Sequence, residues 1–305
     1  MRTYEGSKDK GGGRGRMDRM AVSISLVTPS YNQARFLEET LRSVVSQRDQ
    51  LHEYFVFDGG STDGSVELIR KYANCIDYWE SQKDKGQSDA IHRGFQRATG
   101  EVLGWLNSDD VLLPGALAQV RRAFEEHPEW DVVTGYHAAI DGDSKVIALH
   151  RTPRETLAKV RKGIIRVCQQ TCFFRRRLYE KVGGLNLSLH CVMDHDLWVR
   201  MFDAGARWGH VPRYLAGYRW HSDSKGMSWN KKYADEREWM SRTYPHYPLY
   251  HGSRLARAVY QAGLLTSGRY PLARFQTLRA AGRKLTDVFG DWAVNGSPCV
   301  RGDAR

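Results

Sequence analysis

Apolar and polar positions are arranged in blocks along the first part of this chain. Short apolar runs, each of strand length, are separated by longer segments in which apolar residues recur every three or four positions. The first pattern predicts buried strands and the second predicts amphipathic helices. The expected strands cover 22–30, 53–58, 75–81 and 101–107, and the expected helices centre on Leu37 to Val45, 62–73, 88–100 and 114–128.

The second part of the chain is less regular. Residues 130–149 predict a hairpin with an Asp-Gly turn, 168–186 a strand and a short helix, and 193–205 a helix. Beyond about residue 230 the pattern favours helices with scattered arginines. Strands that alternate with helices predict an α/β fold, with a mainly parallel sheet covered by helices on both faces.

Composition narrows the class of protein. The chain has 305 residues, 41% of them hydrophobic, and no apolar run approaches the ~20 residues that span a bilayer. Residues 1–20 are polar and glycine-rich, so we expect a disordered basic tail rather than a secretory signal. The five cysteines, with Cys168 and Cys172 four apart and no second pair, favour reduced thiols over a zinc site. A cytoplasmic location is therefore expected.

The net charge of +11 is concentrated at the two ends of the chain. Residues 1–20 hold six basic and three acidic residues, and 241–305 hold ten basic and three acidic residues. Basic ends on a nearly neutral body suggest contact with an anionic partner such as the inner face of a membrane, although they can also serve solubility alone. A nucleic-acid-binding protein would more plausibly carry basic residues interleaved with aromatics on an organised face. The nearly neutral middle of the chain argues against that class, so no nucleic-acid partner is expected.

Two acidic groups follow predicted strands, where open α/β sheets bind ligands. The loop TPSYN, with Thr28, Pro29, Tyr31 and Asn32, can wrap a nucleotide base, and Asp58 can accept an N–H from it, although FDGGS also suits a plain turn. Asp109 and Asp110 concentrate charge that suits Mg²⁺ or Mn²⁺ with phosphate oxygens, although Asp110 can instead cap a helix.

Three further groups carry possible chemistry. Asp89 either bonds ribose or sugar hydroxyls or caps its helix. Asp194 and Asp196 diverge on a helix, so we expect Asp194 to act as a general base and Asp196 to brace the helix start. His221 and Lys225 can contact a metal ion or phosphate, although a lone histidine is often structural.

Together these segments resemble glycosyltransferase family 2, inverting enzymes of the GT-A fold. The matching pieces span about 24–228 and include SLVTPSYNQARFLEETLRSVVSQ, FDGGSTDGS, DKGQSDAIHRGF, GEVLGWLNSDD, GGLNLSLHCVMDHDLWVR and HSDSKGMS. Several motifs in the right order make a specific signal. A GT-A domain is therefore expected over 21–230, followed by a basic helical extension over 231–305.

The resemblance implies a role for each matched residue. Asp58 would recognise the base, Asp89 the ribose or sugar, and Asp109 the metal with Asp110 nearby. Asp194 matches the catalytic base, and His221 matches a histidine near metal and diphosphate. Asn107, beside Ser108 in the donor site, replaces the first acid of the family's Asp-x-Asp element, and Met193 stands where many members carry glutamate.

The resemblance implies transfer of a sugar from a nucleotide-diphosphate donor, with a UDP-sugar expected, to an acceptor hydroxyl. Contact of the basic extension with a membrane would fit a glycan or lipid-linked acceptor in polysaccharide, lipopolysaccharide or glycolipid assembly. Gln169, Gln170, Thr171 and Trp198 are expected on the acceptor side, although Gln169 to Thr171 also suit a sheet edge. The basic extension either docks on anionic lipid or packs on the catalytic domain. The residues that could reach lipid are the basic Arg254, Arg257, Arg269, Arg274, Arg279, Arg283 and Lys284 and the apolar Leu264, Leu265, Phe275 and Leu278.

Other classes fit less well. A sugar nucleotidyltransferase would share the fold and metal but normally shows a glycine-rich phosphate loop after its first strand, which SLVTPSYNQ lacks. A glycosidase also uses two carboxylates but needs no base or metal site. A protein that binds a nucleotide-sugar without transferring the sugar remains an alternative.

Overall fold

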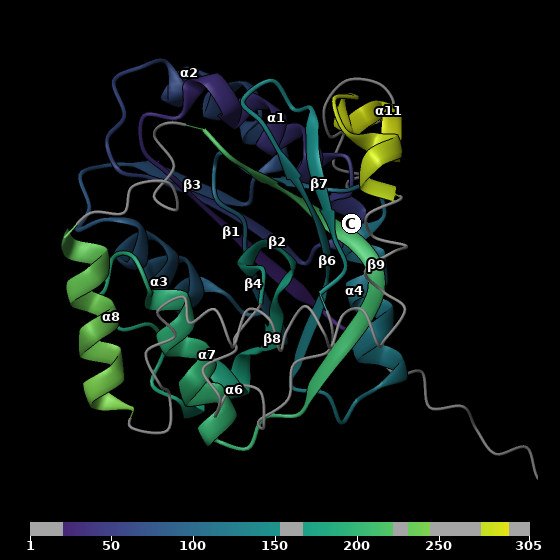
Figure 1. Ribbon diagram of the computed structural model, residues 1–305. Coiled ribbons are helices and arrows are strands. Elements are labelled where there is room, and N and C mark those ends of the chain that lie inside the picture. The colour runs from purple at the N-terminus through teal and green to yellow at the C-terminus, as the bar shows by residue number, and fades with distance from the viewer. Residues whose placement is uncertain (1–20, 153–166, 222–230, 245–275, 293–305) are drawn as a thin grey trace, which may run out of the picture.

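The computed structural model describes residues 21–152, 167–221, 231–244 and 276–292. A twisted sheet runs through the centre of the molecule, and helices lie on both of its faces (Figure 1). Within the described residues, the sheet contains nine strands. They are β1 (Ile24–Ser30), β2 (Glu53–Asp58), β3 (Tyr78–Ser81), β4 (Val102–Trp105), β5 (Val111–Leu112), β6 (Val132–Ile140), β7 (Val146–His150), β8 (Phe173–Arg175) and β9 (Trp208–Arg219).

The strands lie in the order β3-β2-β1-β4-β8-β6-β9-β5, with β7 added to β6. β1 to β4 are parallel, and β6 and β9 are parallel to each other. β8 joins these two groups through antiparallel pairing on both sides, so both groups run in the same direction. The structure therefore confirms the expected α/β fold with a mostly parallel sheet.

Helices cover both faces because each buries an apolar stripe. One core lies under α1 (Ala34–Val45), α2 (Ser65–Lys71) and α4 (Ala116–Glu126). The other lies under α3 (Gln87–Arg97), α6 (Arg176–Lys181) and α7 (Met193–Asp203). At Gly94 an added Cβ would lie 2.6 Å from Val27, so this glycine lets α3 approach β1 closely. In the described part of the chain, 3₁₀ turns cover Arg48–Gln50, Ala73–Cys75 and Gln169–Thr171.

The carboxyl ends of the first strands meet at one edge of the sheet. Ser30 at the end of β1 pairs with Asp58 at the end of β2, and Asp58 pairs with Ser81 at the end of β3. Val27 in β1 pairs with Trp105, the last residue of β4. The loops that carry the predicted site residues therefore leave the sheet at the same edge.

The long strand β9 is absent from the sequence prediction. Its sequence, WGHVPRYLAGYR, contains a proline and two glycines and has no regular alternation of buried and exposed positions. The irregularity has a structural reason, because the pairing of β9 with β6 shifts register near Gly135 and Tyr136. β9 matters for the site because it ends at Arg219, two residues before His221.

The described parts of the extension pack on the catalytic domain. α8 (Lys231–Thr243) contributes Met240 to the core that also contains α7. Residues 276–292, with α11 (Leu285–Phe289), pack on β5, β6 and β7 through Ala280, Leu285 and Trp292. In these parts the extension therefore packs on the rest of the protein, as one of the two alternatives from the sequence expects. Several residues expected to reach lipid lie outside the described residues: Arg254, Arg257, Arg269, Arg274, Leu264, Leu265 and Phe275.

Candidate active site

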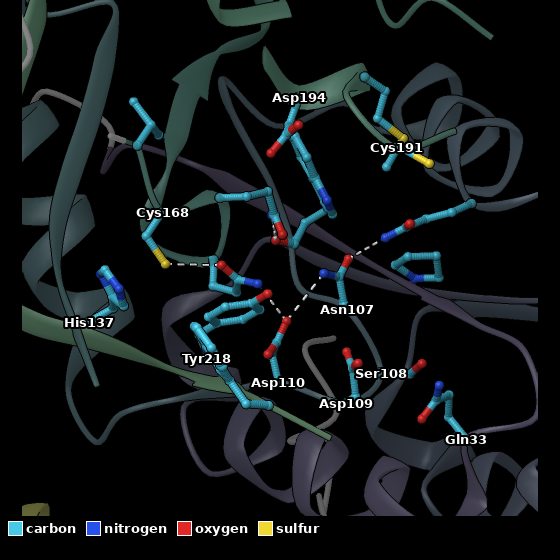
Figure 2. Close-up of a pocket in the computed structure, with 18 of the residues that line it drawn as sticks. Gln33, Asn107, Ser108, Asp109, Asp110, His137, Cys168, Cys191, Asp194 and Tyr218 are labelled. Carbon is cyan, nitrogen blue, oxygen red and sulfur yellow. Dashed lines mark hydrogen bonds between the residues drawn. The ribbon is translucent and has the colours of Figure 1, made fainter. Parts of the chain in front are cut away.

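A cavity of about 1590 Å³ opens at the carboxyl edge of the sheet. The loop after β1 and the residues after β4 form one part of its wall, and the start of α7 forms another. Figure 2 shows Asp194 on one side of the cavity, with Asn107, Asp109 and Asp110 below it and His137 on a further wall. The fold therefore brings Asp194, the acidic pair Asp109 and Asp110, and the amide of Asn107 together around one cavity.

The adjacent carboxylates Asp109 and Asp110 have different surroundings. Asp110 is buried, and its Oδ1 accepts the Arg219 backbone N–H at 2.8 Å. Its Oδ2 accepts from Gln170 Nε2 at 2.7 Å and from Asn107 Nδ2 at 3.2 Å. Burial, followed by the charge of Asp109, holds the pKa of Asp110 well above its usual range. The sequence predicted Asp110 as a metal ligand. Both of its carboxylate oxygens instead accept hydrogen bonds from groups of the protein.

Asp109 and His221 form the pair that best suits a cation. His221 Nε2 lies 3.0 Å from Asp109 Oδ2, and the imidazole packs beside Phe36 with ring centres 4.6 Å apart. One carboxylate oxygen and one imidazole nitrogen suit Mn²⁺, and a site with few protein ligands leaves positions for phosphate oxygens. No group of three or more His, Cys, Asp or Glu side chains positioned for a metal occurs within the described residues.

Arg219 organises this side of the cavity, and the sequence analysis did not identify it. Its guanidinium is almost fully buried and donates to the Asp109 carbonyl at 2.7 Å. It also bonds Ser144 Oγ at 2.8 Å and Glu39 Oε2 at 2.6 Å. Arg219 thus joins the acidic loop, the β6–β7 turn and α1. An arginine within the apolar segment YLAGYRW is a sequence signal for such a buried charge with partners.

Asp194 lies in the first turn of α7 and lines the cavity. Its Oδ1 accepts the backbone N–H of His195 at 2.8 Å. Asp196 is buried, pairs with Arg200 at 2.6 Å and accepts a hydrogen bond from the Tyr244 hydroxyl at 2.6 Å. The structure thus confirms that the two acids diverge and that Asp196 braces the helix.

On the expected base side, Pro29 and Tyr31 line the cavity. The other three residues support the loops. Thr28 is buried and bonds the Tyr54 hydroxyl at 3.0 Å, and Asn32 accepts the Thr62 N–H at 3.0 Å. Asp58 is buried and holds its own turn, with Oδ2 accepting from Ser61 N at 2.8 Å and Ser81 Oγ at 2.7 Å. This matches the turn reading of the sequence, and base recognition by Asp58 stays a prediction.

The remaining predicted residues likewise divide into those that line the cavity and those that do not. Ser108, Gln169 and Gln170 line the cavity, whereas Asp89, Thr171 and Trp198 do not. Asp89 accepts the Lys85 backbone N–H at 3.3 Å, just before α3 begins, and both its contact with ribose or sugar and its capping of the helix stay predictions. Thr171 and Trp198 are fully buried, and Trp198 stacks on Trp105 with ring centres 5.7 Å apart. Lys225 lies outside the described residues.

A wall of the cavity that the sequence analysis did not identify comes from the β6–β7 hairpin. His137 and His150 line it, and their rings stack with centres 4.6 Å apart. Burial, with a smaller contribution from His150, lowers the pKa of His137 to about 3. His137 is therefore uncharged near neutral pH, so this wall adds no positive charge through His137.

The chain belongs to glycosyltransferase family 2. Residues 25–183, a little more than half of the chain, match the family described as Glycosyl transferase family 2. The matched segment contains the first four strands and the acidic pair Asp109 and Asp110. The protein is therefore a glycosyltransferase. No helix in the described ranges is long and apolar enough to cross a membrane.

Relatives support this assignment. The chain is 30% identical over 185 residues to an uncharacterized glycosyltransferase of Mycobacterium tuberculosis, covering 59% of this chain and 69% of that protein. It is 28% identical to a PGL/p-HBAD biosynthesis glycosyltransferase of Mycobacterium bovis, covering 64% of this chain and 74% of that protein.

Solved structures share the fold at low sequence identity. TarS of S. aureus in complex with UDP-GlcNAc has a TM-score of 0.59 at 16% identity and covers 77% of this chain and 69% of that one. A mannosyltransferase from Pyrobaculum calidifontis in complex with GDP-Man and Mn²⁺ has a TM-score of 0.52 at 19% identity, covering 75% and 62%. These likenesses show the GT-A fold alone.

Proposed function

We propose that this protein is an inverting glycosyltransferase that moves a sugar from a nucleotide-diphosphate donor to an acceptor hydroxyl. The observation that carries the proposal is the arrangement of one cavity, in which Asp194 lies across from Asp109, and Asp109 contacts His221. A base on one side and a diphosphate site on the other suit displacement at a carbon held between them.

Asp194 acts as the general base. Its carboxylate takes the proton of the acceptor hydroxyl as that oxygen attacks the anomeric carbon. The new bond forms between the acceptor oxygen and the anomeric carbon while the bond from that carbon to the diphosphate oxygen breaks. Attack from the face opposite the leaving diphosphate inverts the anomeric configuration.

Asp109 and His221 would hold Mn²⁺ or Mg²⁺. A bound divalent cation would neutralise charge on the diphosphate as it leaves. The Mn²⁺ reported with the Pyrobaculum mannosyltransferase supports this cofactor. Arg219 keeps the acidic loop in place through the Asp109 carbonyl, and Lys225 is proposed as a further contact to phosphate.

A UDP-sugar is the proposed donor. TarS, which shares the fold, was solved with UDP-GlcNAc and with UDP, although the Pyrobaculum enzyme was solved with GDP-Man. Pro29, Tyr31, Asn107 and Ser108 are proposed to line the nucleotide site. Thr28, Asn32, Asp58 and Asp89 are proposed to shape it.

The proposed acceptor is a glycan or a lipid-linked glycan in bacterial polysaccharide, lipopolysaccharide or glycolipid assembly. The similarity to the PGL/p-HBAD biosynthesis glycosyltransferase of Mycobacterium bovis supports such a setting. Gln169 and Gln170 are proposed as acceptor-side contacts, with Thr171 and Trp198 behind them. We propose that the protein works in the cytoplasm, in contact with the inner face of the membrane.

The test is a nucleotide-release assay with a panel of UDP-, GDP- and dTDP-sugars and Mn²⁺ or Mg²⁺, with EDTA as a control. We expect metal-dependent UDP release from one UDP-sugar, with water as the slow acceptor. Asp194→Asn should abolish turnover while donor binding, measured by calorimetry, remains. Asp203→Asn, an exposed change on the same helix, should leave both unchanged.

The possible results separate the candidate functions. Turnover of a GDP- or dTDP-sugar alone would keep the enzyme class and change the nucleotide. Nucleotide-sugar binding without release would favour a binding protein, and formation of the nucleotide-sugar from a sugar phosphate would favour a nucleotidyltransferase. Full turnover by Asp194→Asn would overturn the assignment of the base.

A further inference from the structure

A carboxylate outside the matched family region binds the turn that leads into the helix carrying Asp194. Glu236 in α8 is 8% exposed. Its Oε1 accepts the backbone N–H of His190 at 2.9 Å. Its Oε2 accepts those of Cys191 and Val192 at 2.7 Å and 3.2 Å. These three residues come directly before Met193, where α7 begins.

Glu236 therefore holds the N–H groups of the turn that leads into α7, and the last of these belongs to the cap residue of the helix. The residue at the cap position of α7 is Val192, which provides no side-chain cap. A carboxylate is well suited to this place because it accepts several N–H groups and its charge is favourable at a helix N-terminus.

The same turn is held from its other side. Ser88, at the start of α3, donates from Oγ to the Leu189 carbonyl at 2.6 Å. α8 adds Met240, which is 1% exposed in the core it shares with α7. Just beyond α8, the Tyr244 hydroxyl bonds Asp196. The turn before Asp194 is therefore fixed between the donor-side helix α3 and the extension helix α8.

We propose that Glu236 is a positioning residue for the base. By holding the N–H groups of 190–192, it fixes the turn from which α7 starts and so the place of the Asp194 carboxylate. This inference rests on the proposed role of Asp194. The Asp109–His221 pair comes from other segments, so losing Glu236 should slow the chemical step without weakening donor binding.

The experiment compares Glu236→Ala with Glu238→Ala. Glu238 is on the same helix, and its side chain is 55% exposed and pairs with Arg242. With the UDP-sugar and metal that give the fastest release, Glu236→Ala should lower kcat about tenfold to a hundredfold and leave the donor KM within about twofold. Glu238→Ala should change neither quantity.

Rescue by a small carboxylate distinguishes positioning from general loss of structure. Added formate can occupy the space left in Glu236→Ala and accept the same N–H groups, so kcat should rise with formate concentration. Formate should not raise kcat in Glu238→Ala or Asp194→Asn. Glu236→Gln, which keeps the size and one acceptor oxygen, should give an intermediate kcat and provides a second variant if the alanine variant does not fold.

Two outcomes would overturn the proposal. One is wild-type kcat in folded Glu236→Ala or Glu236→Gln while Asp194→Asn is inactive, which leaves the base assignment intact. The other is a parallel loss of kcat and donor binding that formate does not restore. Full activity of Asp194→Asn would instead overturn the proposed function itself.

Discussion

At the scale of single residues, Asn107 explains how two adjacent carboxylates are accommodated at the cavity. Its Nδ2 donates to Asp110 Oδ2 at 3.2 Å, and its Oδ1 accepts from Gln87 Nε2 at 2.6 Å. An aspartate at this position has no donor for Asp110 once it is ionised. The amide therefore fits a site in which Asp110 is buried and bonded within the protein.

We expect Asn107→Asp to be destabilised, and more so as pH rises. A second carboxylate beside Asp110 would raise the pKa values of the pair in the folded state above their unfolded values. The folded protein then binds more protons than the unfolded one, so stability present at acidic pH is lost as pH rises through the folded-state pKa values. Thermal unfolding should show a melting temperature close to wild type near pH 4 to 5 and lower by about 5 °C near pH 8.

Asn186→Asp is the matched control for this change. The Asn186 Oδ1 accepts from Ser188 N at 3.1 Å and Ser188 Oγ at 2.7 Å, so an aspartate oxygen can take over both bonds. Its melting temperature should follow wild type across the same pH range. A melting temperature of Asn107→Asp that is equally low at acidic and alkaline pH would contradict the charge explanation.

At the scale of elements, the sequence predicts the strands and helices whose apolar pattern is set within the segment itself. β2 was predicted at its observed bounds, because an apolar run between polar turns is a signal contained in the run itself. β9 was not predicted, because its irregular pattern follows from its pairing with β6. The bonds of Asp110 to Gln170 and Arg219, and those of Glu236 to the turn before α7, join residues 44 to 109 positions apart, and no local pattern records such contacts.

The segment 276–292 gives a prediction at this scale. Trp292 is 4% exposed and donates from Nε1 to the Leu112 carbonyl in β5 at 2.8 Å. Trp292→Ala should lower the free energy of unfolding by about 3–5 kcal/mol, because it leaves a cavity in the cluster with Ala280 and Leu285. Urea unfolding measures the loss.

Trp239→Ala serves as the comparison, because Trp239 is 37% exposed on α8. A smaller loss of stability is expected there. If the two variants lose equal stability, or if Trp292→Ala loses none, the segment 276–292 does not pack on the sheet in solution as it does in the structure.

At the scale of the whole molecule, order along the chain determined what could be predicted. Asp58 ends β2 and Asp109 follows β4, so their arrival at one edge of the sheet follows from parallel strands. Asp194 reaches the cavity at that edge from the first turn of α7. The parallel sheet does not determine which side-chain atoms face that cavity. Asp58 and Asp110 are turned into hydrogen-bond networks, and that choice depends on donors from β3, β9 and the turn Gln169–Thr171.

The distribution of charge over the whole molecule gives the last prediction. With a net charge of +11, the protein should co-sediment with vesicles that contain anionic lipid at low salt, and high salt should prevent it. Arg279, Arg283 and Lys284 are exposed near Leu278, which is 72% exposed. Reversing these three charges to glutamate should weaken sedimentation more than the same net change at Arg70, Lys71 and Arg122, which lie on α2 and α4. Equal weakening would assign the binding to net charge alone, and sedimentation with neutral vesicles or none at low salt would contradict an electrostatic membrane contact.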